Sequence, residues 1–144
     1  LFINGHNGHI GKKSVAGYDC LGALLNDSLG DKYYAIGTDA MNTTFNSQKD
    51  NGGFEVVEVS NTNDLNGQLA NSDENMFYVD FEKVAAEEGW KQILESKQRI
   101  TTLNVSLSGL QKMMKSAYTT TIIPGETFDG MIVFKEVEPT TLLK

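Results

Sequence analysis

The sequence predicts an α/β fold with a largely parallel sheet and flanking helices. Apolar stretches of strand length alternate with segments of helical periodicity, which is typical of parallel sheets joined by crossover helices. The run Met131–Phe134 is apolar without interruption, which is typical of a strand covered on both faces. At 144 residues, the chain has the length of one domain with its own core, so residues 1–144 are treated as a single domain.

The first expected elements are a strand and a helix. Leu1–Asn4 begins with three apolar residues and predicts the end of a buried strand. A helix is expected from about Ser14, and Gly30 stands where a left-handed cap ends such a helix. The apolar residues of this helix recur at three- and four-residue spacing: Tyr18, Leu21, Leu25 and Leu29.

Strands and polar segments then alternate as far as residue 81. Further strands are expected at Tyr33–Ile36, Phe54–Val59 and Met76–Phe81. The segments between them are polar and predict loops: Asp39–Gly53, and Asn61–Asn75 with a short helical turn near Leu65–Leu69.

The rest of the chain predicts a helix, an irregular segment and a closing strand. Val84–Ser96 has helical periodicity, with Trp90 on the side that faces the core. Ser106–Tyr118 predicts a weak helix or a structured loop, in which the pair Met113–Met114 fills gaps in the core. The strand Phe128–Phe134 ends the order.

Composition excludes several classes of partner. The formal charge of −7 repels nucleic acid and anionic lipid, and the few clustered lysines are too few to form a basic stripe. No apolar segment approaches the roughly 20 residues that span a bilayer. The single cysteine, Cys20, predicts a buried thiol and allows no intrachain disulfide. We therefore expect a cytoplasmic protein without nucleic-acid or membrane partners.

The sequence begins at Leu1, inside the first expected strand, although termini normally fray at the surface. No secretory signal pattern is visible. We therefore expect this chain to be a piece of a longer polypeptide.

Both histidines lie in one glycine-containing loop, GHNGHIGKKS, that precedes the first helix. A P-loop would require glycine where His6 stands and a hydroxyl where Lys13 stands, so that motif is absent. The dinucleotide pattern is absent as well, because the glycines at 5, 8 and 11 are all three residues apart. A loosely held anion at the helix start stays an alternative.

A metal site lacks ligands in this loop. Zinc sites use three or four protein ligands, whereas the loop offers two histidines and Cys20 is distant in the sequence. Carboxylates such as Asp39 or Asp80 could complete a set, but their spacing does not indicate one. We expect no metal and no cofactor.

Acid–base chemistry fits the residue types better. An imidazole with a pKa near 6.5 can take or give a proton at neutral pH. Gly5 and Gly8 are expected to adopt backbone shapes barred to other residues and to leave room for a substrate. In the alternative interpretation, His6 and His9 only bond backbone groups and shape the turn. The residue types alone leave both interpretations open.

Four short blocks carry a family resemblance. They are HNGH at 6–9, Leu21-Gly22 with Leu25, GDKYYAIG at 30–37, and FDGMIVF at 128–134 with Pro139. Together they resemble the C-terminal half of the erythromycin esterase family. The middle, Thr38 to Thr127, matches only in general layout. The segment TDAMN at 38–42 departs from the glycine-rich phenylalanine segment that the family tends to have there.

The resemblance implies that this chain is part of a larger α/β hydrolytic domain. Family members hydrolyse esters with an activated water and without a metal. Their substrates include macrolide lactones, and this activity is linked to macrolide resistance. The resemblance implies that His6 and His9 are catalytic, and we assign Asn7 and Gly8 to substrate binding. The expected partners are a small-molecule ester and the N-terminal half of the same polypeptide, which supplies a further histidine, glutamates and an arginine.

In the resulting hypothesis, His6 polarises the substrate carbonyl or orients the water, and His9 holds charge or assists positioning. The primary base comes from the N-terminal half, so the chain alone is expected to be inactive. Two alternatives are a haem- or small-ligand-binding module and a non-catalytic homologue with a structural loop. The carboxylates Asp39, Glu126 and Asp129 are expected to cap or bond locally.

Overall fold

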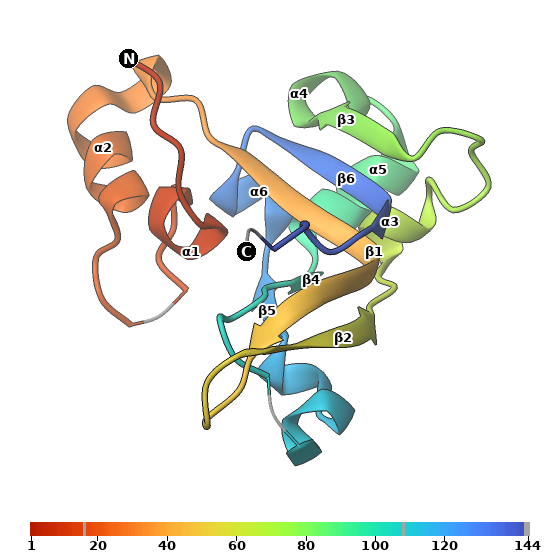
Figure 1. Cartoon of the computed structure of the whole chain (residues 1–144). Coiled ribbons are helices and arrows are strands. Elements are labelled where there is room, and N and C mark those ends of the chain that lie inside the picture. The colour runs from red at the N-terminus through yellow and green to blue at the C-terminus, as the bar shows by residue number, and fades with distance from the viewer. Residues whose placement is uncertain (16, 108, 143–144) are drawn as a thin grey trace.

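The structure is a computed structural model that describes residues 1–15, 17–107 and 109–142. Its centre is a four-stranded sheet with the strand order β2–β1–β6–β3 (Figure 1). These strands are β1 (Ile36–Gln48), β2 (Phe54–Ser60), β3 (Met76–Asp80) and β6 (Gly130–Val137). A separate two-stranded sheet pairs β4 (Gln98–Thr101) with β5 (Thr119–Ile122).

Short helices connect the strands in the described part of the chain. The α-helices are α1 (Asn7–Ile10), α2 (Leu21–Leu29), α3 (Asp64–Gly67), α4 (Phe81–Val84), α5 (Glu88–Glu95) and α6 (Pro124–Thr127). The 3₁₀ helices are η1 (Gly30–Lys32), η2 (Gly109–Met113) and η3 (Lys115–Ala117). Figure 1 shows α1 and α2 together at one side of the sheet, away from α3 and α5.

The four-stranded sheet is mostly antiparallel, so the expectation of a largely parallel sheet is wrong. Of its three strand pairs, β1–β6 is parallel, whereas β1–β2 and β3–β6 are antiparallel. The reason lies in the segment expected to be a loop, because residues 39–48 continue β1. A tight turn then reverses the chain into β2, and Gly52 and Gly53 supply the positive φ angles of that turn.

The sequence did not predict residues 39–48 as part of a strand, because the inward-facing side chains of β1 are polar there. Asp39, Thr43 and Ser47 are buried at four-residue spacing along the strand. The Oδ1 atom of Asp39 accepts hydrogen bonds from the backbone N–H groups of Ala40 and Thr101, at 2.9 and 2.8 Å. Its Oδ2 atom accepts bonds from two asparagine side chains of the α3 region, at 2.8 and 3.0 Å. Asp39 therefore joins β1 to β4 and to α3.

One face of the sheet forms the main core. Val79, Met131 and Val133 pack there against α3, α5 and the small sheet. The buried partners from those elements are Leu65, Leu94, Ile100 and Ile122. A second cluster lies under β2 and contains Val57, Val59, Leu107 and Tyr118.

The other face of the sheet is open over β3 and the start of β1. Cross-strand pairing places Tyr78 beside Ile132 and Met76 beside Phe134 on this face. Met76 is 61% exposed and Tyr78 is 49% exposed, whereas Ile132 and Phe134 are half-buried. The continuous apolar run in β6 is thus well covered on one side, and only partly covered on the other.

Several expectations about elements are confirmed. Strands at Phe54–Ser60, Met76–Asp80 and Gly130–Val137 and the short turn α3 lie close to their expected positions. Helix α2 ends at Gly30, whose φ is +54°, and Cys20 is buried. In the described part of the chain, no helix has the length and apolar character needed to cross a bilayer.

Other expectations are wrong. Leu1–Asn4 is exposed and forms no strand, and the first long helix begins at Leu21, not near Ser14. Residues 33–35 precede β1 instead of forming a strand, and β4 and β5 were not expected. Met113 and Met114 are exposed because η2 and η3 lie at the surface, so these methionines do not fill the core.

We predict that Asp39→Ala lowers the free energy of unfolding by about 2–4 kcal/mol, because four hydrogen-bond donors lose their acceptor inside the protein. Asp27→Ala, at an exposed position on α2, serves as the matched control and is expected to change stability by less than about 0.5 kcal/mol. Urea unfolding measures both variants. Equal stability of the two would show that Asp39 does not hold β1, β4 and α3 together.

Candidate functional site

The two histidines lie on the short helix α1. His6 is the N-cap of this helix, and its Nδ1 atom accepts a hydrogen bond from the backbone N–H of Gly8 at 3.3 Å. His9 lies in the last turn of the same helix. Both side chains are exposed, and their ring centroids are 6.3 Å apart with the ring planes inclined at 66°. The loop therefore presents both imidazoles together at the surface.

The cap bond fixes which atom of His6 can act. Because Nδ1 accepts a hydrogen bond from the Gly8 N–H, the neutral ring carries its own proton on Nε2. The free edge of His6 is then a hydrogen-bond donor, which suits polarisation of a carbonyl oxygen better than removal of a proton. Neither Gly5 nor Gly8 has a positive φ, so the expectation that these glycines supply barred backbone shapes is wrong.

Asn7 holds the loop against strand β1. Its Oδ1 accepts a bond from the backbone N–H of Thr38 at 3.0 Å, and its Nδ2 donates to the Thr38 carbonyl at 2.7 Å. The side chain of Asn7 thus pairs with the strand as a short backbone segment would. The Gly8 N–H donates to Nδ1 of His6, which is the N-cap. The two residues assigned to substrate binding therefore bond to strand β1 and to His6 in this structure.

The end of α1 is fixed by neighbours that are distant in sequence. The Ile10 carbonyl accepts a bond from the Tyr33 hydroxyl at 2.6 Å, and the Gly11 carbonyl accepts one from the Cys20 thiol at 3.3 Å. Helix α2 crosses here at very short range, since a Cβ atom on Gly22 would lie 2.3 Å from the Ile10 carbonyl group. Glycine at position 22 is therefore required for this close approach.

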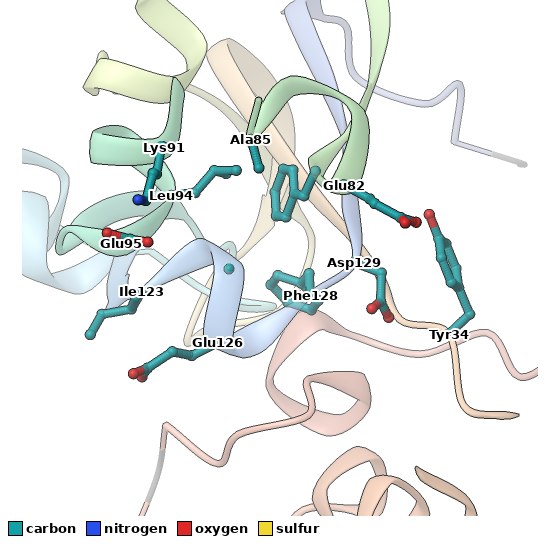
Figure 2. A pocket seen from close by; sticks show the side chains of 12 residues that line it. Tyr34, Glu82, Ala85, Lys91, Leu94, Glu95, Ile123, Glu126, Phe128 and Asp129 are labelled. Carbon is teal, nitrogen blue, oxygen red and sulfur yellow. The ribbon is translucent and has the colours of Figure 1, made fainter. Parts of the chain in front are cut away.

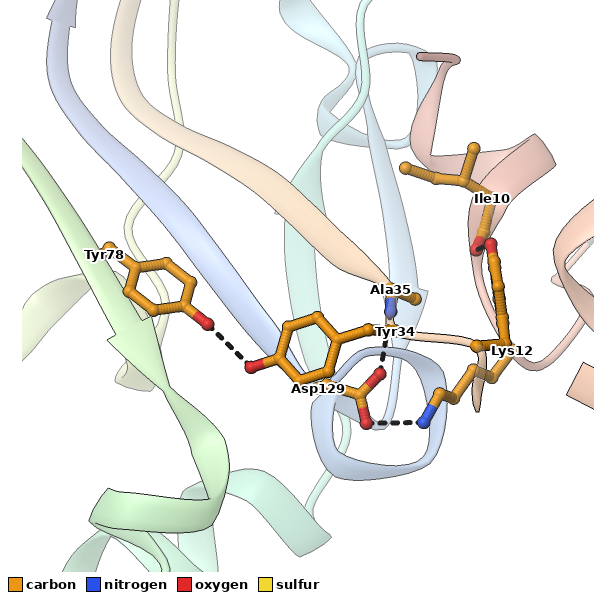
Figure 3. Close-up of polar contacts among 7 residues, drawn as sticks. Ile10, Lys12, Tyr34, Ala35, Tyr78 and Asp129 are labelled. Carbon is orange, nitrogen blue, oxygen red and sulfur yellow. Dashed lines mark hydrogen bonds and ion pairs between the residues drawn. The ribbon is translucent and has the colours of Figure 1, made fainter. Parts of the chain in front are cut away.

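Asp129, directly before β6, ties the histidine loop to the sheet (Figure 3). Its Oδ1 lies 2.5 Å from the Lys12 ammonium, and its Oδ2 accepts a bond from the Ala35 N–H at 2.7 Å. Its backbone N–H donates to the Ala35 carbonyl, and its own carbonyl accepts from the Phe81 N–H. Asp129 thus joins the loop to the starts of β1, β6 and α4. These partners are distant in the sequence, so the expectation of local bonding is wrong.

A cleft of ≈ 420 Å³ opens beside Asp129, between α4, α5 and α6 (Figure 2). Lys13, on the histidine loop, pairs with Glu126 of this cleft at 2.5 Å. Consecutive lysines of the loop therefore bind two carboxylates that line the cleft. The imidazoles themselves do not line it.

The location of the loop differs from the expected one. Because Leu1–Asn4 predicts a strand, the sequence places the loop that follows it at the carboxyl ends of parallel strands. In the structure, the loop bonds to residues around the amino ends of the parallel pair β1 and β6, such as Ala35 and Asp129. The loop therefore reaches the sheet through polar side chains and not through a strand of its own.

The same region offers no metal site and no carboxylate free for acid–base chemistry at Asp39 among the described residues. Within the described residues, no group of three or more His, Cys, Asp and Glu side chains could hold a metal ion. Burial raises the pKa of Asp39, while its four hydrogen bonds act in the opposite direction. Those bonds all go to β1, β4 and the α3 region, so we interpret Asp39 as a structural group.

Sequence reasoning found the histidines but missed the groups that position them. Three contacts hold the loop, and each joins residues that are separated in the sequence. Lys12 bonds to Asp129, the Tyr33 hydroxyl bonds to the Ile10 carbonyl, and the Cys20 thiol bonds to the Gly11 carbonyl. Lys12 and Asp129 are 117 residues apart, and no spacing rule connects them. The one available signal was that Asp129 stands directly before the closing strand.

Comparisons with known proteins agree with this fold. The erythromycin esterase family model matches residues 1–137. A solved structure of a protein from Bacillus cereus has a TM-score of 0.76 at 22% identity, covering 96% of this chain and 34% of its own. A structure described as a succinoglycan biosynthesis protein has a TM-score of 0.71 at 17% identity, covering 91% of this chain and 31% of its own. The chain thus spans about a third of both solved chains. No curated protein matches it.

We predict that Gly22→Ala displaces α2 from α1 and lowers the free energy of unfolding by about 3 kcal/mol. The new methyl group would overlap backbone atoms of Ile10 and Gly11, which cannot avoid it by a side-chain rotation. Gly89→Ala on α5 is the matched control, since open space surrounds that position and alanine favours a helix. The control is expected to be unchanged or slightly more stable in urea unfolding. A tolerated Gly22→Ala would show that α2 does not hold the loop.

Proposed function

The chain belongs to the erythromycin esterase family, and from this premise we propose that it forms one wall of an esterase-like hydrolase site with His6 and His9 as its imidazoles. The observation that carries the proposal is the presentation of two exposed rings on a loop held by Asn7, Lys12 and Gly22. Catalysis requires such fixed geometry, because small displacements of a positioned group are costly in rate.

In the proposed reaction, the Nε2–H of His6 donates to the substrate carbonyl oxygen, where negative charge develops as water attacks the carbon. The attacking water loses its proton to a base from another part of the polypeptide, and the departing alkoxide takes up a proton as the ester bond breaks. His9 lies beside this centre and assists by holding charge or position. The proposed chemistry needs no metal.

We propose a small-molecule ester as substrate, with macrolide lactones as the family's own example. The N-terminal half of the same polypeptide is the proposed partner. Two features support that partner: the chain spans about a third of the solved chains that it resembles, and one sheet face is open and apolar around Met76 and Tyr78. Covering such a face removes apolar surface from water.

The haem-binding alternative has no specific support. The imidazoles lie on an exposed loop and do not line the cleft beside Asp129. The effect of His6→Ala on ester turnover distinguishes the non-catalytic alternative from the proposal.

We predict that His6→Ala lowers kcat/KM for p-nitrophenyl butyrate by about 10²–10⁴ in the polypeptide that carries both halves. His6→Gln is expected to retain more activity than His6→Ala, because its amide still donates a hydrogen bond toward the substrate. Asn4→Ala, exposed and just before the loop, is the matched control and should leave turnover unchanged.

Unchanged turnover in His6→Ala would overturn the assignment of His6. Equal losses in His6→Ala and His6→Gln would overturn its role as a donor while keeping its involvement in the reaction.

A further inference from the structure

The cleft between α4, α5 and α6 has no part in the histidine chemistry proposed above, yet it has the properties of a ligand site. Its volume of ≈ 420 Å³ lies in the range of small-molecule sites. Its floor is apolar, because it is formed by the side chains of Phe81, Leu94 and Phe128. The exposed fractions of these residues are at most 4%. Figure 2 shows Phe128 and Leu94 inside the ring of charged side chains.

The walls of the cleft are held in place by backbone contacts. The Phe81 N–H donates to the Asp129 carbonyl at 3.0 Å, which joins the start of α4 to the start of β6. On the other side, α6 lies close to α5, because a Cβ atom on Gly125 would be 3.2 Å from the Leu94 carbonyl oxygen. A ligand would therefore enter a largely preformed space, and little ordering free energy would oppose binding.

The rim of the cleft is rich in carboxylates. Glu82, Glu95, Glu126 and Asp129 line it, and Lys91 is the lysine that lines it with them. Asp129 and Glu126 already pair with the two lysines of the histidine loop. Within the described part of the chain, the carboxylates of Glu82 and Glu95 make no hydrogen bond or ion pair closer than 4 Å. These two acids are therefore available to a ligand.

An exposed tyrosine completes the rim near Glu82 (Figure 2). The Tyr34 hydroxyl lies 2.8 Å from the hydroxyl of Tyr78, and this hydrogen bond raises the pKa of Tyr34. Tyr34 is thus a neutral aromatic surface at the mouth of the cleft. Aromatic faces attract cations, so the ring adds to the preference set by the carboxylates.

We propose that this cleft binds a small molecule with an apolar, ring-sized body and one ammonium group. The body occupies the floor of Phe81, Leu94 and Phe128, and the ammonium group lies at the mouth beside the Glu82 carboxylate and the Tyr34 ring, which Figure 2 shows next to each other. The net charge of the whole chain, −7, also favours a cationic ligand. This site is separate from the ester hydrolysis proposed above, and its test does not depend on that proposal.

The test is a titration of the full chain with phenethylammonium chloride, followed by amide chemical shifts in NMR. We expect saturable shifts at residues around Leu94 and Phe128. The neutral analogue 2-phenylethanol should bind about 3- to 10-fold more weakly, and the anion 3-phenylpropionate should give no saturable shifts. Absence of saturable shifts with the ammonium, or equal binding of the anion, would overturn the proposal.

Two variants assign the site. Glu82→Gln combined with Glu95→Gln removes both charges at exposed positions and should weaken phenethylammonium binding by about 3- to 10-fold. Glu88→Gln, on α5 but outside the cleft lining, should leave binding unchanged. Ala85→Trp places a large ring at the mouth and should abolish binding. Unaltered affinity in the double variant would overturn the role of the carboxylates, whatever the fold of Ala85→Trp.

Discussion

The Asp129 carboxylate is the contact on which the functional region depends. One oxygen binds the Lys12 ammonium of the histidine loop, and the other accepts the N–H of Ala35 at the entrance to β1. The pair is only partly exposed, at 21% for the lysine side chain and 25% for the aspartate, so solvent screens it less than an open surface ion pair. Without this carboxylate, the loop would be joined to β1 chiefly through Asn7.

Two separate features follow from the position of Asp129. On one side, the loop that it holds presents His6 and His9 at the surface, where the proposed N-terminal half would complete a site. On the other side, the same residue lines the cleft between α4, α5 and α6. A single residue before β6 therefore connects the proposed catalytic loop to the proposed ammonium site, although the chemistry of the two is different.

The sequence predicted the parts of the fold that apolar patterning controls. Phe54–Ser60, Met76–Asp80 and β6 were found because their side chains bury apolar surface. Strand β1 was missed over residues 39–48, because buried hydrogen bonds to Asp39 and Ser47 replace apolar packing there. The histidine pair was found by residue type and family resemblance. Its supports were not, because contacts such as Lys12–Asp129 join residues that no local pattern relates.

A double-mutant cycle on Lys12→Met and Asp129→Asn tests the central claim most directly, with amide hydrogen exchange at His9 and Gly11 as the local readout. Both amides donate within the loop, to the carbonyls of His6 and Asn7. If Asp129 holds the loop, the coupling free energy is about 1–2 kcal/mol, and either single change accelerates exchange at both amides to a similar degree. Additive effects on stability, with exchange at His9 and Gly11 as slow as in the unaltered chain, would contradict the account.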